Sequence, residues 1–175
     1  GLKRLPTERY SIVKEAKAPD VILVRSQDMH GMNFEPNLKA IGRAGAGVNN
    51  IPVPELSRRG VPVFNTPGAN ANAVKELVLA GMLIAARNLA PALDFVRAID
   101  SGAADLHKRV EDGKKSFAGV ELPGHTLGVV GLGKVGSLVA EAAIRLGMHV
   151  LGFDPEITVD AAWSLPSQVR RAATI

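Results

Sequence analysis

Residues 126–154 read TLGVVGLGKVGSLVAEAAIRLGMHVLGFD, and the architecture can be worked out from this stretch. The apolar run 126–130 predicts a buried strand that leads into a glycine-rich turn. Residues 138–146 follow with a helical pattern, and 149–153 predict a second strand, which Asp154 follows. Strand, turn, helix and strand in this order predict a βαβ unit with parallel strands.

The turn has the spacing of a dinucleotide-binding loop. Gly131 allows the tight turn, Gly133 lets a pyrophosphate approach the backbone, and Gly136 allows close packing of helix on strand. The helix N-terminus offers free N–H groups to phosphates. Asp154 comes 23 residues after Gly131, where its carboxylate can accept hydrogen bonds from ribose hydroxyls.

The alternative is a βαβ unit that binds nothing, because GxGxxG alone is a weak signal. Both strands, the helix and the acid stand in the required order here, and this context favours a dinucleotide. Pro155 and Glu156 follow the acid, with no adjacent Arg to neutralise a 2′-phosphate. The sequence therefore predicts NAD rather than NADP.

The region before this unit predicts a second parallel sheet. Strands are expected at 21–24, 38–43 and 61–65, with a short helix at 52–59 that Gly60 ends. Strands separated by connections of this kind predict an α/β sheet whose ligand edge lies at the carboxyl ends of its strands.

A long helical pattern connects the two regions. It begins at Asn72, with Asn70 or Asn72 as N-cap, and Pro91 is expected to kink or end it near 89–90. A second helical segment covers 92–99, and the charged, glycine-containing residues 101–124 predict a surface connection. The first helix is apolar on more than one face, which predicts a core or subunit-interface position.

Composition narrows the function classes. The chain has 175 residues, of which 46% are hydrophobic and 22% charged, and it has no Cys. No membrane span, signal peptide, disulfide, thiolate metal site or Cys nucleophile is expected, and a cytoplasmic location is the default. The net charge of +4 is spread in single or paired residues with few aromatics, so small anions rather than nucleic acid are the expected partners.

A second glycine-rich loop, AGAGVNN at 44–50, follows the strand at 38–43. By itself it predicts a plain turn as readily as a site. With Arg25 and Arg43 at the ends of neighbouring strands, it predicts an anion site of backbone N–H donors and guanidinium groups. The alternative for each Arg is a solvated surface charge.

Several motifs in this order resemble the D-2-hydroxyacid dehydrogenase family, and its bacterial D-3-phosphoglycerate dehydrogenase branch in particular. They are IGRAGAGVNN at 41–50, VPVFNTPGAN at 61–70, Glu76-Leu77, the glycines of 131–136, and FDP at 153–155. The resemblance implies an incomplete flavodoxin-like substrate-binding domain at 1–69 and an incomplete Rossmann NAD-binding domain at 70–175, both with parallel sheets. It also implies substrate and NAD between the domains, and a homodimer or higher homo-oligomer built on the coenzyme domain.

The resemblance assigns roles to individual residues. The NAD-binding set is Gly131, Gly133, Lys134, Val135, Gly136, Asp154 and Ala46, with Lys134 and Val135 at the pyrophosphate. The substrate-binding set is Arg25, Arg43, Gly45, Ala46 and Lys75. No residue set predicts a metal.

Two positions depart from the family pattern. Asn49 stands where the family often has Asp, which removes any role of that carboxylate. Lys75 stands where relatives usually carry a small residue, and its ammonium is hypothesised to favour a phosphorylated substrate.

The family's catalytic groups are a His in a Pro-His segment, a supporting Glu and a later Arg. None of the four histidines has that context, so no catalytic residue is assigned and the set is expected beyond Ile175. We therefore expect an N-terminal fragment, with an opening strand missing and the cofactor sheet cut after its first βαβ unit. We expect this chain to be inactive alone.

The resemblance implies that the intact enzyme oxidises 3-phosphoglycerate to 3-phosphohydroxypyruvate with NAD, a step of serine biosynthesis. Within the same class, glyoxylate or hydroxypyruvate reductase and D-lactate dehydrogenase are alternatives. From another class, the alternative is a non-catalytic NAD-sensing protein on this scaffold, as in the C-terminal-binding protein co-repressors.

Overall fold

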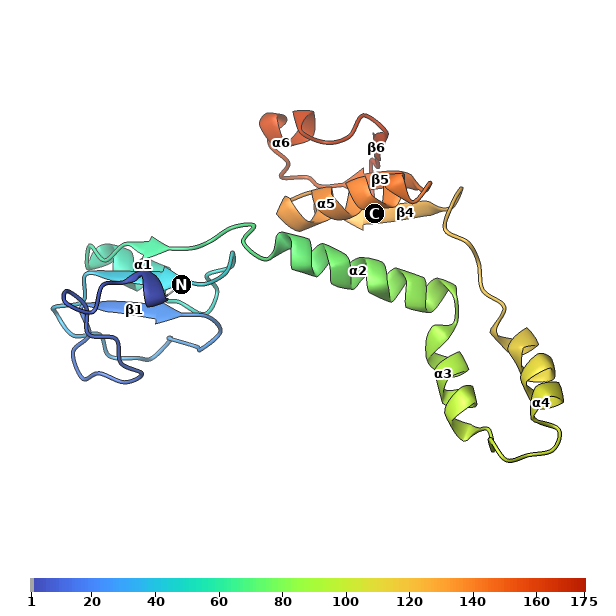
Figure 1. Ribbon diagram of the computed structural model, residues 1–175. Coiled ribbons are helices and arrows are strands. Elements are labelled where there is room, and N and C mark those ends of the chain that lie inside the picture. Colours follow the sequence, from blue (N-terminus) through green and yellow to red (C-terminus); the bar gives the residue numbers. More distant parts are fainter. Residues whose placement is uncertain (1) are drawn as a thin grey trace. The chain divides into compact units, whose positions relative to one another are not determined.

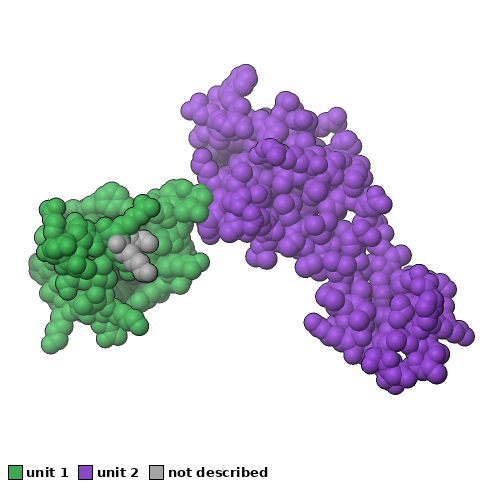
Figure 2. Space-filling model, in the orientation of Figure 1, with its two compact units in different colours: residues 1–69 green, residues 70–175 purple. Residues whose placement is uncertain are grey.

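The computed structural model describes residues 2–175 and divides the chain into two compact units, Gly1–Ala69 and Asn70–Ile175 (Figure 2). Each unit has its own parallel sheet and its own buried apolar cluster. The predicted fold class, α/β with two parallel sheets, is confirmed.

The sheet of the first unit has three parallel strands in the order β1-β2-β3 (Figure 1). They are Val21–Val24 (β1), Ala40–Arg43 (β2) and Val63–Phe64 (β3). The three strands predicted here are confirmed, and two are shorter than expected. In the β1–β2 register Val24 lies opposite Arg43, so the carboxyl ends of both strands meet at one edge.

The core of the first unit forms where the α1 helix, Val53–Arg58, covers the sheet. Ile41 and Leu56 are completely buried there. The predicted helix end at Gly60 is confirmed: its φ is +71°, and the Val61 N–H donates to the Leu56 carbonyl at 2.9 Å. This 6→1 hydrogen bond is the mark of a Schellman cap. A short 3-10 helix, η1 (Leu2–Arg4), precedes the sheet.

The sheet of the second unit is also parallel, in the order β4-β5-β6. Its strands are Thr126–Val130 (β4), His149–Phe153 (β5) and Val169–Arg171 (β6). The first two confirm the predicted strands, whereas β6 lies beyond the βαβ unit expected from the sequence. Three parallel strands in sequential order correspond to one half of a doubly wound nucleotide-binding sheet.

Two helices connect these strands: α5, Lys134–Arg145, and α6, Val159–Trp163. Ala140 and Ala143 of α5 are completely buried against β4 and β5. Gly147 ends α5 with φ +79°. The small buried alanines allow α5 to pack close to the sheet.

The α2 helix, Ala71–Ala86, packs against α5 and contributes Met82 to the core of the second unit. Asn70 is its N-cap residue, without a side-chain capping bond. The sequence predicted a break near 89–90 and a second helical segment after it; both are confirmed, but Pro91 is not the cause of the break. The break lies at Asn88, whose left-handed backbone (φ 50°) separates α2 from a second helix, α3 (Leu89–Ala98), at 64°.

Pro91 is accommodated without a kink because it lies in the first turn of α3, where its missing N–H has no intrahelical acceptor to lose. The predicted surface connection at 101–124 needs correction too, since it contains the helix α4, Leu106–Gly113, and the 3-10 helix η2, Lys114–Phe117.

No single helix in residues 2–175 combines the length and apolar character needed to cross a membrane. The bent pair α2–α3 has the length and apolar character of a membrane span only when both helices are counted together.

Candidate functional site

The first site lies at the carboxyl ends of β4 and β5, in the second unit. Gly131 ends β4 with φ +87°, a conformation that L side chains rarely adopt, and its N–H donates to the Phe153 carbonyl at 2.8 Å. This hydrogen bond fastens the turn to the neighbouring strand. The chain then enters α5 directly, with Gly133 as the N-cap residue.

Gly136 is required by packing inside the protein. A Cβ built on it would overlap the carbonyl oxygen of Gly131 and lie 3.3 Å from a methyl group of Val129. The helix can therefore approach the strand this closely only without a side chain at 136. This is the role that the glycine spacing predicts.

Gly133 is different, because a Cβ built there meets no atom within 4 Å. The protein therefore leaves the space above Gly133 free, and a ligand can approach the backbone there. The first-turn N–H groups of α5 have no acceptor within the helix, so they are available to an anion. Lys134 is exposed beside them, and Val135 is half-buried.

Asp154 is held in a fixed position at the end of β5. Its Oδ2 accepts a hydrogen bond from the Leu132 N–H at 2.8 Å, and its Oδ1 accepts one from the Glu156 N–H at 3.0 Å. Each oxygen keeps a further lone pair for a ligand. The half-buried carboxylate can thus accept from a pair of adjacent hydroxyls, such as those of a ribose.

A cavity of about 860 Å³ adjoins this acid, between α6 and the ends of β5 and β6. Its wall is mostly apolar, with Asp154, Ser167 and Arg171 among its polar members. Sequence reasoning missed Arg171, because 17 positions separate it from the acid along the chain. Only the pairing of β5 with β6 brings it to the same cavity, and no motif signals that pairing.

The second site lies at the carboxyl edge of the first unit's sheet, where the loop 44–47 follows β2. Hydrogen bonds fix this loop to the neighbouring strands: Ala44 N–H to the Val24 carbonyl at 2.8 Å, and Thr66 N–H to the Gly45 carbonyl at 2.9 Å. The Asn65 amide adds a bond to the Ala46 carbonyl at 2.7 Å. The loop is therefore pre-organised rather than a free turn.

Arg43 lies against this loop. A Cβ on Gly45 would overlap the guanidinium of Arg43, so the glycine makes room for that group. The Nε of Arg43 is buried without a hydrogen-bond partner among residues 2–175. A buried guanidinium N–H without an acceptor is costly, which makes Arg43 a candidate for contact with an anion. Arg25 is exposed after the end of β1.

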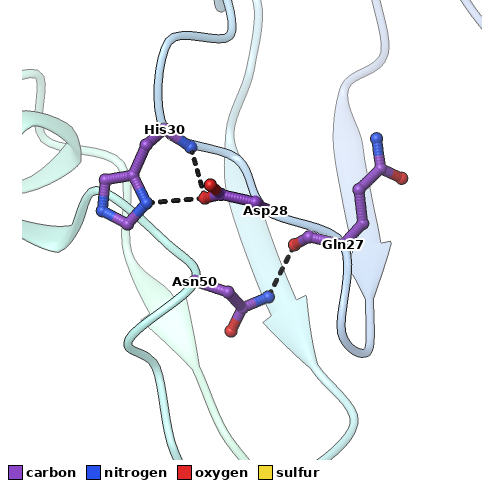
Figure 3. A network of polar contacts seen from close by, with 4 residues as sticks. All are labelled: Gln27, Asp28, His30 and Asn50. Atoms are coloured by element: carbon purple, nitrogen blue, oxygen red, sulfur yellow. Dashed lines mark hydrogen bonds and ion pairs between the residues drawn. The ribbon is translucent and has the colours of Figure 1, made fainter.

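The loops after β1 and β2 are also fastened to each other (Figure 3). The Asn50 amide donates to the Gln27 carbonyl at 2.7 Å, and the Met29 N–H donates to the Asn50 carbonyl at 2.8 Å. Beside them, the His30 backbone N–H and the His30 imidazole hold the pKa of the Asp28 carboxyl below its usual value of 3.8. The network stabilises the edge that carries Arg25 and Arg43.

Lys75 belongs to the second unit, whereas the other predicted substrate residues belong to the first. It lies half-buried on α2 and donates to the Asn72 side-chain oxygen, while the Asn72 amide donates to Glu76 at 2.7 Å. The ammonium is thus held along the first turns of α2. Asn49, where the family often has Asp, is exposed.

Within residues 2–175, no group of three or more His, Asp or Glu side chains is arranged to hold a metal ion.

Comparisons with known proteins agree with this architecture. Residues 3–174 match the family model described as D-isomer specific 2-hydroxyacid dehydrogenase, catalytic domain. The chain is 40% identical over 162 residues to D-3-phosphoglycerate dehydrogenase of Methanocaldococcus jannaschii, a match that covers 90% of this chain and 28% of that protein. It is 36% identical over 151 residues to hydroxypyruvate reductase of Thermotoga maritima, covering 85% of this chain and 46% of that protein.

Among solved structures, the fold is similar to cofactor (NAD⁺) bound 3-phosphoglycerate dehydrogenase of Entamoeba histolytica. The TM-score is 0.58 at 28% sequence identity, over 89% of this chain and 41% of that one. The chain thus spans less than half the length of each of these three proteins.

Proposed function

The chain belongs to the D-isomer specific 2-hydroxyacid dehydrogenase family, and from this premise we propose that it supplies the cofactor site and the substrate-anion site of an NAD-dependent oxidoreductase. The second unit, 70–175, is proposed to bind NAD, and the first unit, 1–69, to bind the substrate. The observation that carries the proposal is the open space at Gly133 beside the fixed Asp154 carboxylate.

NAD fits this site in charge and in space. The pyrophosphate would lie against Gly133 and the free N–H groups of the first turn of α5, with Lys134 exposed beside it. The adenosine ribose would bind Asp154, whose two oxygens are already held by backbone N–H groups. Ala46 of the first unit is proposed as a further NAD contact.

The substrate is proposed to be a small anionic 2-hydroxy acid. Arg25, Arg43 and the loop that contains Gly45 and Ala46 would bind its carboxylate, since the buried Nε of Arg43 needs an acceptor. Lys75 is proposed to favour a phosphorylated substrate. A charge-assisted hydrogen bond to such a group is about twice as strong as a neutral one.

The preferred substrate is 3-phosphoglycerate, which fits the basic residues and the M. jannaschii relative. Bound NAD would take a hydride from C2 while the hydroxyl proton leaves to a base, giving 3-phosphohydroxypyruvate. The base is proposed to lie outside this chain. The reverse reaction on hydroxypyruvate is the second candidate, because the T. maritima relative is a hydroxypyruvate reductase.

We also propose that the protein works in the cytoplasm, in serine biosynthesis, as a homodimer or higher homo-oligomer built on the second unit. Exposed apolar side chains on α2 and α3 support the last point, since Leu77 is 74% exposed and Leu93 56% exposed.

Calorimetry on the 175-residue chain tests the proposal. We expect NAD to bind, 3-phosphoglycerate to bind more tightly than D-lactate or glyoxylate, and no NADH to form when both ligands are present. Absence of NAD binding would overturn the cofactor site. Equal affinity for phosphorylated and unphosphorylated acids would overturn the choice of substrate, and NADH formation would show that the chain carries its own base.

A further inference from the structure

Arg171 and Asp154 line the same cavity from adjacent strands. Arg171 lies opposite Gly152 in the β5–β6 register, and the Ala172 N–H donates to the Gly152 carbonyl at 2.9 Å. Asp154 is two residues further along the chain, immediately after the end of β5. With the spacing and rise of parallel strands, the Cα atoms of Arg171 and Asp154 are roughly 8 Å apart, within reach of one bound phosphate.

The side chain of Arg171 projects on the face that carries the glycine-rich loop. Alternate residues of a strand share a face, so Arg171 lies on the same side as Val169. Val169 packs in the core cluster with Leu132, and a Cβ on Gly152 would meet Leu132 at 2.7 Å. Arg170 points to the opposite face, so the two arginines are not equivalent.

The guanidinium of Arg171 is available to a ligand. None of the ion pairs found in the described part of the chain includes it. Its residue is exposed at the cavity wall. An unpaired guanidinium that lines a pocket can bind a phosphate in bidentate fashion.

If the ribose hydroxyls of an adenosine are hydrogen-bonded to Asp154, a phosphate on the 2′-oxygen would lie in the cavity that Asp154 and Arg171 line. Asp154 alone would repel that phosphate. No Arg is adjacent to it in the sequence, and for this reason the sequence predicts NAD. We propose that Arg171 offsets this repulsion, so that the site accepts 2′-phosphorylated adenosine nucleotides as well as the unphosphorylated ones. The inference rests on the proposed NAD site and makes the cofactor preference graded, set by Asp154 and Arg171 together.

Two adenosine fragments test the idea by calorimetry on the full chain: 5′-AMP, and 2′,5′-ADP, which adds only the 2′-phosphate. In Arg171→Ala we expect the affinity for 2′,5′-ADP to fall about 10-fold or more, the scale of one lost charge-assisted contact, while AMP binding changes less than about twofold. Arg170→Ala, on the other face, should change neither. Asp154→Asn should raise the affinity for 2′,5′-ADP relative to AMP.

The outcomes separate the two proposals. An equal loss for both fragments in Arg171→Ala, or no loss for either, would overturn the role of Arg171 and leave the NAD site intact. Failure of the unmodified chain to bind AMP and NAD would overturn the proposed function, and this inference with it. Thermal melting of each variant shows that the fold is kept, and Arg171→Lys should restore part of the 2′,5′-ADP binding.

Discussion

The carboxylate of Asp154 accepts a hydrogen bond from the backbone N–H of Leu132, with 2.8 Å between Oδ2 and the nitrogen. The acid at the end of one strand is thereby attached to the glycine-rich turn after the other. The residue proposed to hold a ribose and the turn proposed to hold a pyrophosphate thus have a fixed separation before any ligand arrives. Such pre-organisation lowers the cost of binding.

Replacement of Asp154 by Asn should weaken NAD binding about 10-fold, because a charged acceptor for hydroxyl groups becomes a neutral one. Calorimetry with NAD measures this. Glu156→Gln is the matched control, since that exposed side chain makes none of the hydrogen bonds described here, and it should bind NAD normally. Equal binding by Asp154→Asn and the unmodified chain would count against the ribose assignment.

Gly133→Ala should separate folding from binding. The new methyl group meets no protein atom within 4 Å, so the free energy of unfolding should change by less than about 1 kcal/mol. The methyl group would occupy the space proposed for the pyrophosphate, and NAD affinity should fall at least about 10-fold. Urea unfolding measures the free energy of unfolding, and calorimetry measures the NAD affinity. Unchanged NAD affinity would contradict the prediction.

Gly136→Ala should act on the fold itself. Its methyl group would overlap the Gly131 carbonyl, which is backbone and cannot rotate away, so we expect a loss of about 1–3 kcal/mol in unfolding free energy. Gly128→Ala is the control, because a Cβ there meets nothing within 4 Å. If both variants unfold at the same urea concentration, the close helix–strand contact is not a stabilising constraint.

Much of the fold follows from local signals. Apolar runs predicted the strands at 21–24, 126–130 and 149–153, and Gly60, with positive φ, ended a helix where expected. The family resemblance is confirmed by the match over residues 3–174. These features are predictable because a tight turn, a helix cap or a buried strand each restricts which residue types can stand at a given position.

The misses have physical reasons as well. The α4 helix is short and has only two large apolar residues, Leu106 and Val110, so its apolar pattern is too brief to signal a helix. Polar pairs such as Arg109 to Asp105, at 2.8 Å, cover the rest of it. The α2–α3 break depends on the left-handed backbone conformation of Asn88. The side-chain amide of Asn88 also donates a hydrogen bond to the Ala118 carbonyl, 30 residues away, at 2.9 Å. Both β6 and the placement of Arg171 arise from strand pairing, which is a long-range contact.

Gly45→Ala should impair the anion site. The added methyl group would displace the Arg43 guanidinium, and 3-phosphoglycerate affinity should fall about 10-fold. Gly31→Ala is the matched control: its φ of +76° imposes backbone strain too, yet no atom lies within 4 Å of the new Cβ. If both variants lose affinity equally, backbone strain rather than Arg43 explains the result.

The Asp28 carboxyl should titrate below its usual pKa of 3.8, because the His30 backbone N–H and the His30 imidazole stabilise its charged form. A lowered folded-state pKa stabilises the fold above pH 3.8, and this contribution is lost as the pH falls through the folded-state value. Carboxyl NMR shifts recorded against pH measure it. His30→Ala should raise the Asp28 pKa and His107→Ala should not; an Asp28 pKa at or above 3.8 would contradict this account.

The chain leaves α2 and returns to it at one place. The Val120 N–H donates to the Ala86 carbonyl at 2.8 Å, and a Cβ on Gly119 would overlap the same carbonyl oxygen. Residues 87–119 therefore form a long loop, with helices of its own, whose two ends lie side by side at the end of α2. Lengthening such a loop adds little to the entropic cost of closing it, because that cost grows only with the logarithm of the loop length. We therefore expect a change in the length of 87–119 to alter the free energy of unfolding little, provided that both ends stay attached to α2.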